Sequence, residues 1–354
     1  MPTIQANQLE QFARDLLSAG GATDEEAALT AAGLVSANLC GYDSHGVMRI
    51  PYYVGALAAG EVCSQAEWNV LRESATHLVV DANWGFGHVA AQRLVGRLVE
   101  IAKTSGTGIG TMLQCGHIGR LGQYAEEMAE AGLVSMLMVN SHGAVHRVAP
   151  PGGKASRLAT NPICIGVPHH TSDGAEPLVL DFSTSTTAEG KVRVKWIAGE
   201  AAPDGWLIDN EGQPTNDPSV LYESKPPGAI LPFGGPQAYK GFGLSLMIDI
   251  FCGALSGGLV SREKAESPKG NCVFMLVLDP AHFGGAAHFA AEVQQLAQFV
   301  RDCPRAAGVD RILLPGDPER AMRKQRIENG ISLDDGNWQK LIELAEQLGV
   351  PVPN

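Results

Sequence analysis

The spacing of apolar residues changes twice along the chain, and this change most constrains the fold. Residues 1–75 and 300–354 favour helices, because their apolar residues recur at helical intervals. In residues 76–299, short apolar runs such as "GIGTMLQ", "LVSMLMV", "ICIGVP", "PLVLDF" and "VFMLVLD" are typical of strands, and helical segments separate them. The order predicts an α/β (α+β) protein in which a helical unit from both chain ends surrounds a central α/β unit.

The two end segments contain recognisable helix boundaries. "QANQLEQFARDLLSAGG" ends at two glycines, and "TDEEAALTAAGLVSANLCG" opens with Thr23 and has Glu26 three residues later, the pattern of a capping box. A further helix is expected to begin near Ser44 and to run through "VMRIPYYVGALAAG". "DPERAMRKQRIENG" and "DDGNWQKLIELAEQLG" predict two more helices in the second end segment.

Charge and apolar content exclude several classes of partner. The 354 residues carry a formal net charge of −12 without a basic stripe, so a nucleic-acid partner is not expected. "LSLMIDIFCGALSGGLV" is the most apolar long stretch, but it contains Asp249 and several glycines. It therefore predicts a buried helix, and no membrane span is expected.

The cysteines and the first residues bear on the compartment. Seven cysteines are scattered without a CxxC pair, which favours a reducing cytoplasm over a disulfide framework. "MPTIQANQLEQFARDLL" lacks the apolar run that a signal peptide needs. The sequence therefore predicts a cytoplasmic location.

The stretch "CGYDSHGVMRIPYYV" places Ser44, His45 and Arg49 close together. Residues four apart share a helix face, so His45 and Arg49 are expected to point the same way. An imidazole exchanges a proton near neutral pH, and a guanidinium binds a carboxylate through two parallel hydrogen bonds. This pair suits the reduction of a 2-oxo acid, with Ser44 orienting the imidazole. The alternative is that Ser44 caps a helix and Arg49 is a surface charge.

Two glycine-rich segments lead into predicted helices and are candidate anion sites. "CGHIGRLGQYAEEMAEAG" has His117 just before a helix start, where free N–H groups suit a pyrophosphate. "FGGPQAYKGFGLSLMIDIF" places Lys240 at a helix start, without the spacing of a nucleotide-hydrolysing loop. In both segments the glycines fit an ordinary turn or close helix packing equally well.

Two further segments are weaker candidates. "LVLDFSTSTTAEGKV" ends an apolar strand with Asp181, followed by Ser183, and a carboxylate at a strand end can face a ligand crevice or cap the next segment. "LPGDPERAM" contains Pro315, Gly316 and Asp317, and by itself predicts a capped helix start.

Some familiar site patterns are not met. "SGTGIGTM" echoes a dinucleotide-binding loop, but its third glycine comes one position early and a strand follows. "SHGAVH" and "HH" lack a supporting set of metal ligands, so no metal is expected. A Ser-His-Asp hydrolase from Ser44, His45 and Asp181 is disfavoured, because adjacent side chains on a helix diverge by about 100° and no GxSxG elbow occurs.

Taken in order, six motifs resemble those of the malate/L-lactate dehydrogenase family of the non-Rossmann type, over nearly the whole chain. The motifs are "DSHGVMRIPYY", "GHIGRLGQYAEEMAEAG", "LATNPICIGVP", "LDFSTSTTAEGKV", "GGPQAYKGFGLSLMIDI" and "LPGDPE". That family includes sulfolactate, ureidoglycolate and 2,3-diketogulonate dehydrogenases or reductases. It also includes reductases of cyclic ketimines such as Δ1-piperideine-2-carboxylate.

The resemblance implies a helical domain from residues 1–75 and 300–354, and a cofactor domain from residues 76–299 with a largely antiparallel sheet. It also implies a homodimer that binds NAD or NADP without a Rossmann loop. By resemblance, His45 is the proton donor with Ser44 beside it, Arg49 binds the substrate carboxylate, and Thr160 lies near the substrate. His117 and Asp181 are further catalytic candidates. The resemblance places these residues along the cofactor: His117, Ile118, Gly119, Arg120, Leu121, Ser141, Asp181, Phe182, Ser183, Lys240, Pro315, Gly316 and Asp317.

The implied reaction is hydride transfer between nicotinamide and C2 of a small 2-oxo or 2-hydroxy acid. One alternative is reduction of a cyclic ketimine 2-carboxylate, and two remoter ones are a nucleotide-binding protein without catalysis and a hydrolase. The chain departs from the family at Cys115-Gly116, where Asn or Ser often precedes the histidine, and at Phe182-Ser183, where Met-Ala is common. These departures affect the surroundings of cofactor and substrate.

Overall fold

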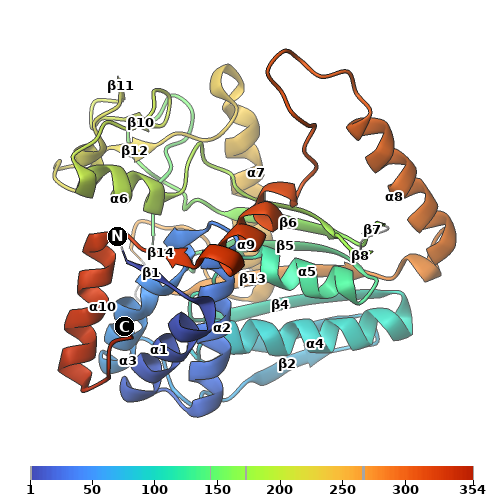
Figure 1. The fold of residues 1–354 in the computed structure, drawn as a ribbon, viewed down its shortest axis with the longest axis horizontal. Helices are drawn as coiled ribbons and strands as arrows, with labels where there is room; N and C mark the ends of the chain where they lie inside the picture. The colour runs from blue at the N-terminus through green and yellow to red at the C-terminus, as the bar shows by residue number, and fades with distance from the viewer. Residues whose placement is uncertain (1, 144, 172–173, 265–267, 354) are drawn as a thin grey trace.

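The computed structural model describes residues 2–143, 145–171, 174–264 and 268–353. A seven-stranded sheet lies at its centre (Figure 1). In spatial order its strands are β2 (Asn69–Glu73), β3 (His77–Asp81), β4 (Thr107–Cys115), β13 (Asn271–Leu278), β5 (Val134–Asn140), β6 (Pro162–Val167) and β9 (Leu178–Ser183). β3 and β4 are parallel, and the other neighbouring pairs are antiparallel. The predicted mixed fold with a largely antiparallel sheet is confirmed.

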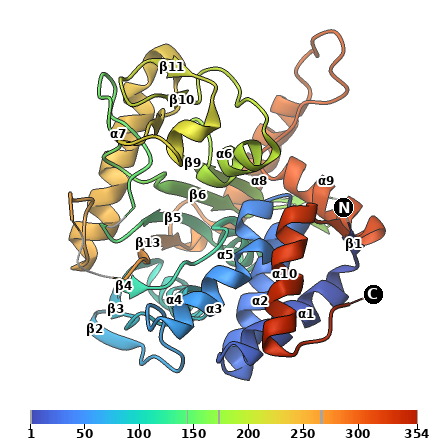
Figure 2. The same ribbon diagram turned by 90° about the vertical axis from the view of Figure 1, so that its left-hand side faces the viewer.

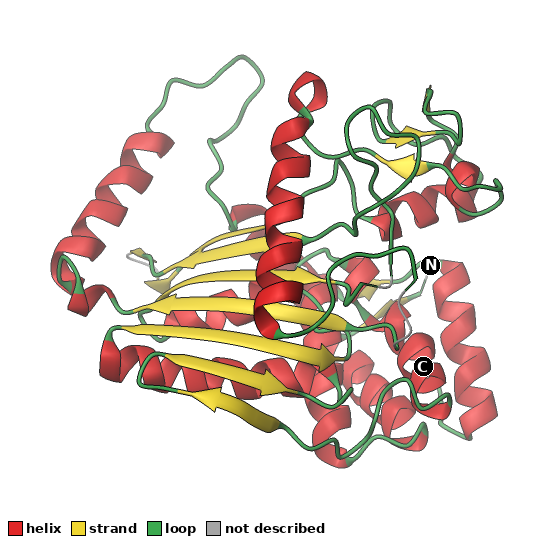
Figure 3. Cartoon of the chain, turned by 180° about the vertical axis from the view of Figure 1, so that it is seen from behind, coloured by secondary structure: helices red, strands yellow, loops and turns green. Residues whose placement is uncertain are grey.

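Helices cover both faces of this sheet. On one face, α4 (Gly87–Ser105) and α5 (Gly122–Glu130) share an apolar core with the strands, which includes Leu94, Leu98 and Tyr124. On the other face lies α7 (Tyr239–Asp249), continued by a π-helical turn at Ile250–Ala254 (Figure 3). The sheet is thus the middle layer of three, and its strand ends are free to carry a site.

Close packing explains the glycines that echo a dinucleotide-binding loop. Gly108 and Gly110 lie inside β4, facing α4. A Cβ on Gly110 would lie 2.7 Å from Leu98 Cδ1, closer than side chains approach one another. These glycines therefore let the helix approach the sheet.

The two end segments of the chain pack against each other (Figure 2). Their helices are α1 (Ala6–Ala19), α2 (Asp24–Leu39), α3 (Ile50–Ala58), α9 (Asp317–Asn329) and α10 (Asp335–Leu348). Strands β1 (Thr3–Ile4) and β14 (Ile331–Ser332) pair, and Leu9, Leu34 and Leu341 share one apolar core. The capping box at the start of α2 is confirmed: Glu26 N donates to Thr23 Oγ1, and Thr23 N donates to Glu26 Oε2 at 2.9 Å.

The predicted helix through this segment is present as α3, but its expected start near Ser44 is wrong. The segment forms two 3-10 turns, Asp43–His45 and Val47–Arg49, and α3 begins only at Ile50. Gly46 separates the turns with an extended backbone (ψ −159°), and Asn38 Oδ1 accepts from Val47 N at 2.9 Å. The Asn38 side chain would collide with a Cβ at position 46, so glycine is required at this break.

Several elements were not predicted. They include strands β1, β2 and β14. They also include α6 (Glu189–Ala198), α8 (Ala286–Arg301), a small sheet of β11 (Pro214–Thr215), β10 (Leu207–Ile208) and β12 (Ala229–Ile230), the pair β7 (His170–Thr171) and β8 (Gly174–Ala175), and 3-10 turns at Pro218–Leu221, Gly235–Gln237 and Pro280–His282. The small sheet and α6 form a separate lobe above the main sheet, and α8 stands apart at the opposite end (Figure 1).

The most apolar stretch is buried on one side. Ile248 and Cys252 are buried against the sheet, but Met247, Ile250 and Leu255 expose 52%, 45% and 58% of their surface. The expectation of a buried helix therefore holds only for the side that faces the sheet. None of the helices in the described part of the chain combines the length and hydropathy of a membrane span.

Candidate active site

A cavity of about 370 Å³ lies where the 3-10 turns after α2 meet the ends of β4, β5 and β6 and the start of α6. Eight residues singled out in the sequence line it. They are His45, Arg49, His117, Ile118, Gly119, Leu121, Ser141 and Thr160. These residues come from four separate segments, so the fold brings together motifs that the sequence only places in order.

His45 lies in this cavity beside Ser44. Ser44 Oγ is 3.0 Å from His45 Nδ1, so the hydroxyl orients the imidazole. The expectation that the two side chains diverge is wrong, because the segment is a 3-10 turn and not an α-helix. Burial, then the charge of Arg49, lowers the pKa of His45 to about 3. The imidazole is therefore neutral at neutral pH and able to accept a proton.

His117 stacks on His45, with ring centroids 5.6 Å apart. Its Nδ1 accepts from Gly119 N at 3.3 Å and lies 2.8 Å from the Tyr53 hydroxyl. A nitrogen that accepts a backbone N–H carries no proton, so the neutral ring bears its proton on Nε2. Burial lowers the pKa of His117 well below its usual value. The ring is thereby fixed as a hydrogen-bond donor at Nε2.

Arg49 is held at the same end of the cavity. Its Nε donates to the Ser44 carbonyl at 2.7 Å, which leaves the two terminal nitrogens for a ligand. No carboxylate among the described residues forms an ion pair with Arg49. A guanidinium held by its Nε and lining a cavity is suited to bind a carboxylate through both terminal nitrogens.

Arg120 and Asp181 lie behind the cavity wall and not in it. Arg120 is 2% exposed, and its Nη2 pairs with Glu126 Oε1 at 2.6 Å. Asp181 Oδ2 accepts from Gly122 N at 2.8 Å, at the start of α5. Burial raises the pKa of Asp181 to about 6, against the opposing charge of Arg120. The pair fixes the loop that follows His117.

The other predicted cofactor residues do not line the cavity either. Phe182 packs edge to face on Phe233, and Ser183 accepts a hydrogen bond from Ser185 Oγ at 3.1 Å. Lys240 is exposed at the start of α7. Pro315, Gly316 and Asp317 form the start of α9, where Asp317 pairs with Arg320 at 2.5 Å and with Arg301 at 3.2 Å. Their assignment to the cofactor remains a prediction.

Sequence reasoning missed several side chains that line or support the cavity, among them Tyr53, Arg147, Asn161, Glu189 and Arg193. Tyr53 follows Arg49 by four residues, and this spacing was the available signal. The other four lie in loops or at the start of α6, far along the chain from His45. No local pattern marked them, because only the folded chain brings these segments together.

The cavity also fits a nicotinamide cofactor. Asn161 is buried, with Nδ2 donating to the Ser245 carbonyl at 3.0 Å and Oδ1 without a donor among the described residues. An unpaired amide oxygen suits the N–H of a carboxamide such as that of nicotinamide. Gly119 has a φ of +76° and lies where a Cβ would collide with the buried His88 ring, so glycine lets the His117 loop pack against His88.

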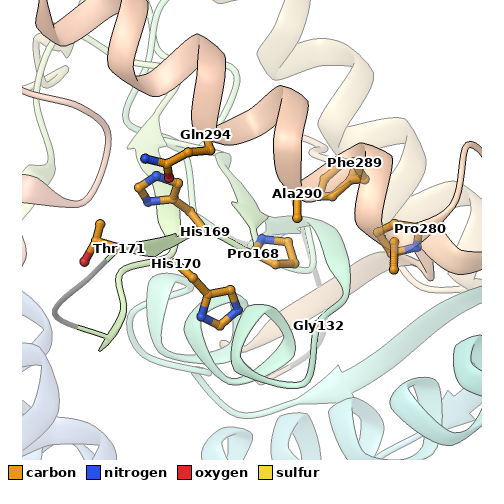
Figure 4. A pocket seen from close by; sticks show the side chains of 10 residues that line it. Gly132, Pro168, His169, His170, Thr171, Pro280, Phe289, Ala290 and Gln294 are labelled. Atoms are coloured by element: carbon orange, nitrogen blue, oxygen red, sulfur yellow. The ribbon is translucent and has the colours of Figure 1, made fainter.

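A second cavity, of about 410 Å³, lies between α8 and the segment Pro168–Thr171 (Figure 4). His169 Nδ1 lies 3.0 Å from the Glu176 carbonyl, and Pro280, Phe289 and Ala290 supply apolar surface. None of the predicted site residues lines this cavity. Within the described residues, no three His, Cys, Asp or Glu side chains are grouped as a metal site would require.

Comparisons with known proteins agree with each other. The family model "Malate/L-lactate dehydrogenase" matches residues 4–342. Hydroxycarboxylate dehydrogenase B of Escherichia coli O157:H7 is 37% identical over 98% of this chain and 95% of its own. The structure of malate dehydrogenase from Pyrococcus horikoshii superposes with a TM-score of 0.88, at 30% identity over 99% of this chain and 97% of its own. The structure of Δ1-piperideine-2-carboxylate reductase from Pseudomonas syringae superposes with a TM-score of 0.83, at 32% identity over 98% of this chain and 100% of its own.

Proposed function

Because the chain belongs to the malate/L-lactate dehydrogenase family and is a 2-hydroxyacid dehydrogenase, we propose that His45 and Arg49 carry its reaction. The reaction is hydride transfer between a nicotinamide and C2 of a small 2-hydroxy or 2-oxo acid. The observation that carries the proposal is the joint presence of His45, with its lowered pKa, and Arg49, with its free terminal nitrogens, in one cavity.

Arg49 binds the substrate carboxylate and so fixes which atoms face His45 and the cofactor. Holding the reactants in one geometry lowers the activation free energy by several kcal/mol. His45 accepts the proton of the 2-hydroxyl during oxidation and returns it during reduction. His117 is the donor in the pair, because its Nδ1 is engaged and its proton lies on Nε2. It holds the substrate oxygen while His45 moves the proton.

In the free protein at pH 7, His45 is in the neutral form that accepts the substrate proton during oxidation. A group with a pKa of about 3 needs no deprotonation before oxidation at pH 7. Reduction requires the imidazolium, which binding of an anionic substrate beside the ring stabilises. The rate of reduction is therefore expected to fall as pH rises.

NAD or NADP, when bound, accepts or supplies the hydride. Asn161, Ser141 and the loop from His117 to Leu121 are the residues proposed to hold the nicotinamide end. Thr160 lies in the same wall and is proposed to contact the substrate side. The choice between NAD and NADP depends on the side chains around the adenosine ribose, so the assay includes both cofactors.

A turnover assay tests this function. NAD and NADP are offered with lactate and malate, and NADH and NADPH with pyruvate and oxaloacetate, and absorbance of the reduced cofactor is followed. Turnover with at least one pair, dependent on His45, supports the proposal. If the protein bound neither cofactor, the proposed function would be wrong.

Arg49→Lys is expected to lower kcat/KM by about 10- to 100-fold, although it keeps the charge. The loss follows because lysine binds a carboxylate as a point charge and loses the paired hydrogen bonds. Steady-state kinetics with saturating cofactor measure it, and Arg72→Lys on the exposed strand β2 is the matched control. Kinetics equal to those of the unchanged protein would take Arg49 out of the site.

Reduction of a cyclic ketimine 2-carboxylate is the second candidate. The structural likeness to Δ1-piperideine-2-carboxylate reductase favours it, and the same carboxylate clamp and proton carrier serve a C=N bond. Adding this ketimine to the panel decides between the two substrate types. Membership of a dehydrogenase family does not support a non-catalytic nucleotide-binding protein or a hydrolase.

The predicted homodimer has support in two exposed apolar surfaces. α7 and its π turn expose Met247, Ile250 and Leu255, and α8 exposes Leu296 and Phe299, at 62% and 77%. Contiguous apolar surface of this kind marks a protein interface. The molecular mass in solution tests the dimer. All seven cysteines are free, which supports the predicted cytoplasmic location.

A further inference from the structure

His88 is a buried histidine next to the His117 loop, and the proposed function gives it no role. It lies in the first turn of α4 and is 2% exposed. Burial lowers the pKa of His88 to about 4, so the ring is neutral at pH 7. Neither ring nitrogen has a hydrogen-bond partner among the described residues, although a buried unpaired N–H group costs free energy. The place of this ring therefore reflects what it packs against.

The His88 ring contacts the loop that follows His117. A Cβ on Gly119 would lie 2.3 Å from His88 Nε2, so the ring packs directly on the Gly119 backbone. The N–H of Gly119 donates to His117 Nδ1 at 3.3 Å. His88 therefore supports one of the two hydrogen-bond partners that His117 Nδ1 has in the described part of the chain.

The ring also contacts the second partner, Tyr53. The rings of Tyr53 and His88 meet edge to face, with centroids 6.0 Å apart and an interplanar angle of 76°. The Tyr53 hydroxyl lies 2.8 Å from His117 Nδ1 and donates to it. Tyr53 is 1% exposed, so its ring is held on all sides by the core. His88 thus touches both groups that engage His117 Nδ1.

Close packing with two further glycines fixes the position of His88. A Cβ on Gly33 of α2 would lie 2.5 Å from His88 Cδ2, so the ring also packs on that helix. A Cβ on Gly87 would lie 2.3 Å from the His117 carbonyl oxygen, so the start of α4 packs on the backbone of His117 itself. Side chains in such close packing move only together with their neighbours. A change at His88 therefore reaches the His117 loop.

We propose that His88 is a positioning residue for His117. It holds Gly119 and Tyr53 where both donate to His117 Nδ1, and it thereby keeps the proton of the neutral His117 ring on Nε2. The inference rests on the proposed function, in which that Nε2 proton holds the substrate oxygen. Without the His88 ring, His117 is free to carry its proton on Nδ1, and Nε2 then has no proton to donate.

Nitrogen-15 chemical shifts of the histidine rings at pH 7 test this role without turnover. The His117 signals, assigned by their absence in His117→Gln, are expected to show the proton on Nε2. His88→Ala removes the ring, and a measurable fraction of His117 is then expected to carry its proton on Nδ1. His88→Leu restores most of the volume and is expected to return His117 toward the Nε2 form, because the His88 nitrogens make no hydrogen bonds that leucine would lose.

Steady-state kinetics give the second readout. His88→Ala is expected to lower kcat by about 10- to 100-fold, the effect of a small misplacement of a catalytic group, while the KM of the substrate changes by less than about 3-fold. Leu98→Ala is the matched control, because Leu98 is buried in the same helix but faces β4, and its truncation also leaves a cavity. This control is expected to leave kcat and the His117 tautomer unchanged, and circular dichroism shows that each variant is folded.

An unchanged His117 tautomer in His88→Ala overturns the inference and leaves the proposed function standing. An equal loss of kcat in Leu98→Ala overturns it as well, because lost stability would then account for both variants. A shifted tautomer with an unchanged kcat overturns the donor role of His117 in the proposed function. If the protein binds neither cofactor, the proposed function is wrong, whereas the His117 tautomer still decides whether His88 positions that ring.

Discussion

His45→Ala is expected to lower kcat for 2-hydroxy acid oxidation by about 10²- to 10⁴-fold, the usual contribution of a positioned acid–base group. Alanine removes the proposed proton acceptor, and the stacked His117 does not replace it, because His117 has its proton on Nε2 and its Nδ1 is engaged by Gly119 and Tyr53. Substrate binding depends on Arg49, so KM is expected to change much less than kcat. Steady-state kinetics at saturating cofactor measure both constants.

The matched control is His170→Ala, because His170 is an exposed histidine on β7 outside the candidate active site. A second variant, His117→Ala, separates the two stacked rings. If His117→Ala abolishes turnover while His45→Ala keeps more than a tenth of kcat, the assignment of the two histidines is reversed.

Acidification from pH 7 to pH 5 is expected to reduce the free energy of unfolding by roughly 3–5 kcal/mol. Burial lowers the pKa of His45 to about 3, that of His88 to about 4, and that of His117 well below 6.5. The unfolded chain takes up protons near pH 6.5, whereas the folded chain does not. Stability is therefore greatest above pH 6.5 and falls below it, by about 2 kcal/mol for each of His45 and His88 by pH 5, and further for His117.

Asp181 opposes this trend in part. Its pKa is raised to about 6, so the folded chain gains this proton before the unfolded chain does. Protonation of Asp181 thereby adds about 1 kcal/mol to the free energy of unfolding between pH 7 and pH 5. The loss from the three histidines is larger, and the sum remains a destabilisation.

Urea unfolding at pH 7 and pH 5, at one protein concentration, measures the change. His88→Gln is expected to remove about a third of it, because His88 is 2% exposed and neither ring nitrogen has a hydrogen-bond partner among the described residues. His170→Gln, at an exposed position, should leave the difference intact. Equal unfolding free energies at the two pH values would show that these rings titrate normally.

The parts of the fold that sequence reasoning found are those with long periodic signals. Strands β4, β5 and β13 are continuous apolar runs, and α4 and α10 show helical spacing over many residues. α8 was missed, because a helix that exposes Leu296 and Phe299 does not follow the rule that apolar faces are buried. The strands of the small sheet contain two residues each, too few for an alternation to appear.

The candidate site could be predicted where its reactive residues lie close together in the sequence. Ser44, His45 and Arg49 lie close together in the chain, and their residue types alone suggest binding of a carboxylate and transfer of a proton. Their exact arrangement was not predictable, because it depends on Asn38 holding Val47 N across the break at Gly46. Arg147 lies about a hundred residues away in the sequence, and only the folded chain brings it to the same cavity.

The pairing of β1 with β14 joins residues 3–4 to residues 331–332. During synthesis, α1, α2 and α3 leave the ribosome early, but their apolar core also needs Ile331 and Leu341, which are made much later. The central sheet can form before that, from strands complete by Leu278. The turn that carries His45 lies between α2 and α3, so it gains its final support only when the last helix docks. Assembly of the catalytic turn therefore waits for the synthesis of α10, and a chain truncated before α10 would contain a sheet without a finished site.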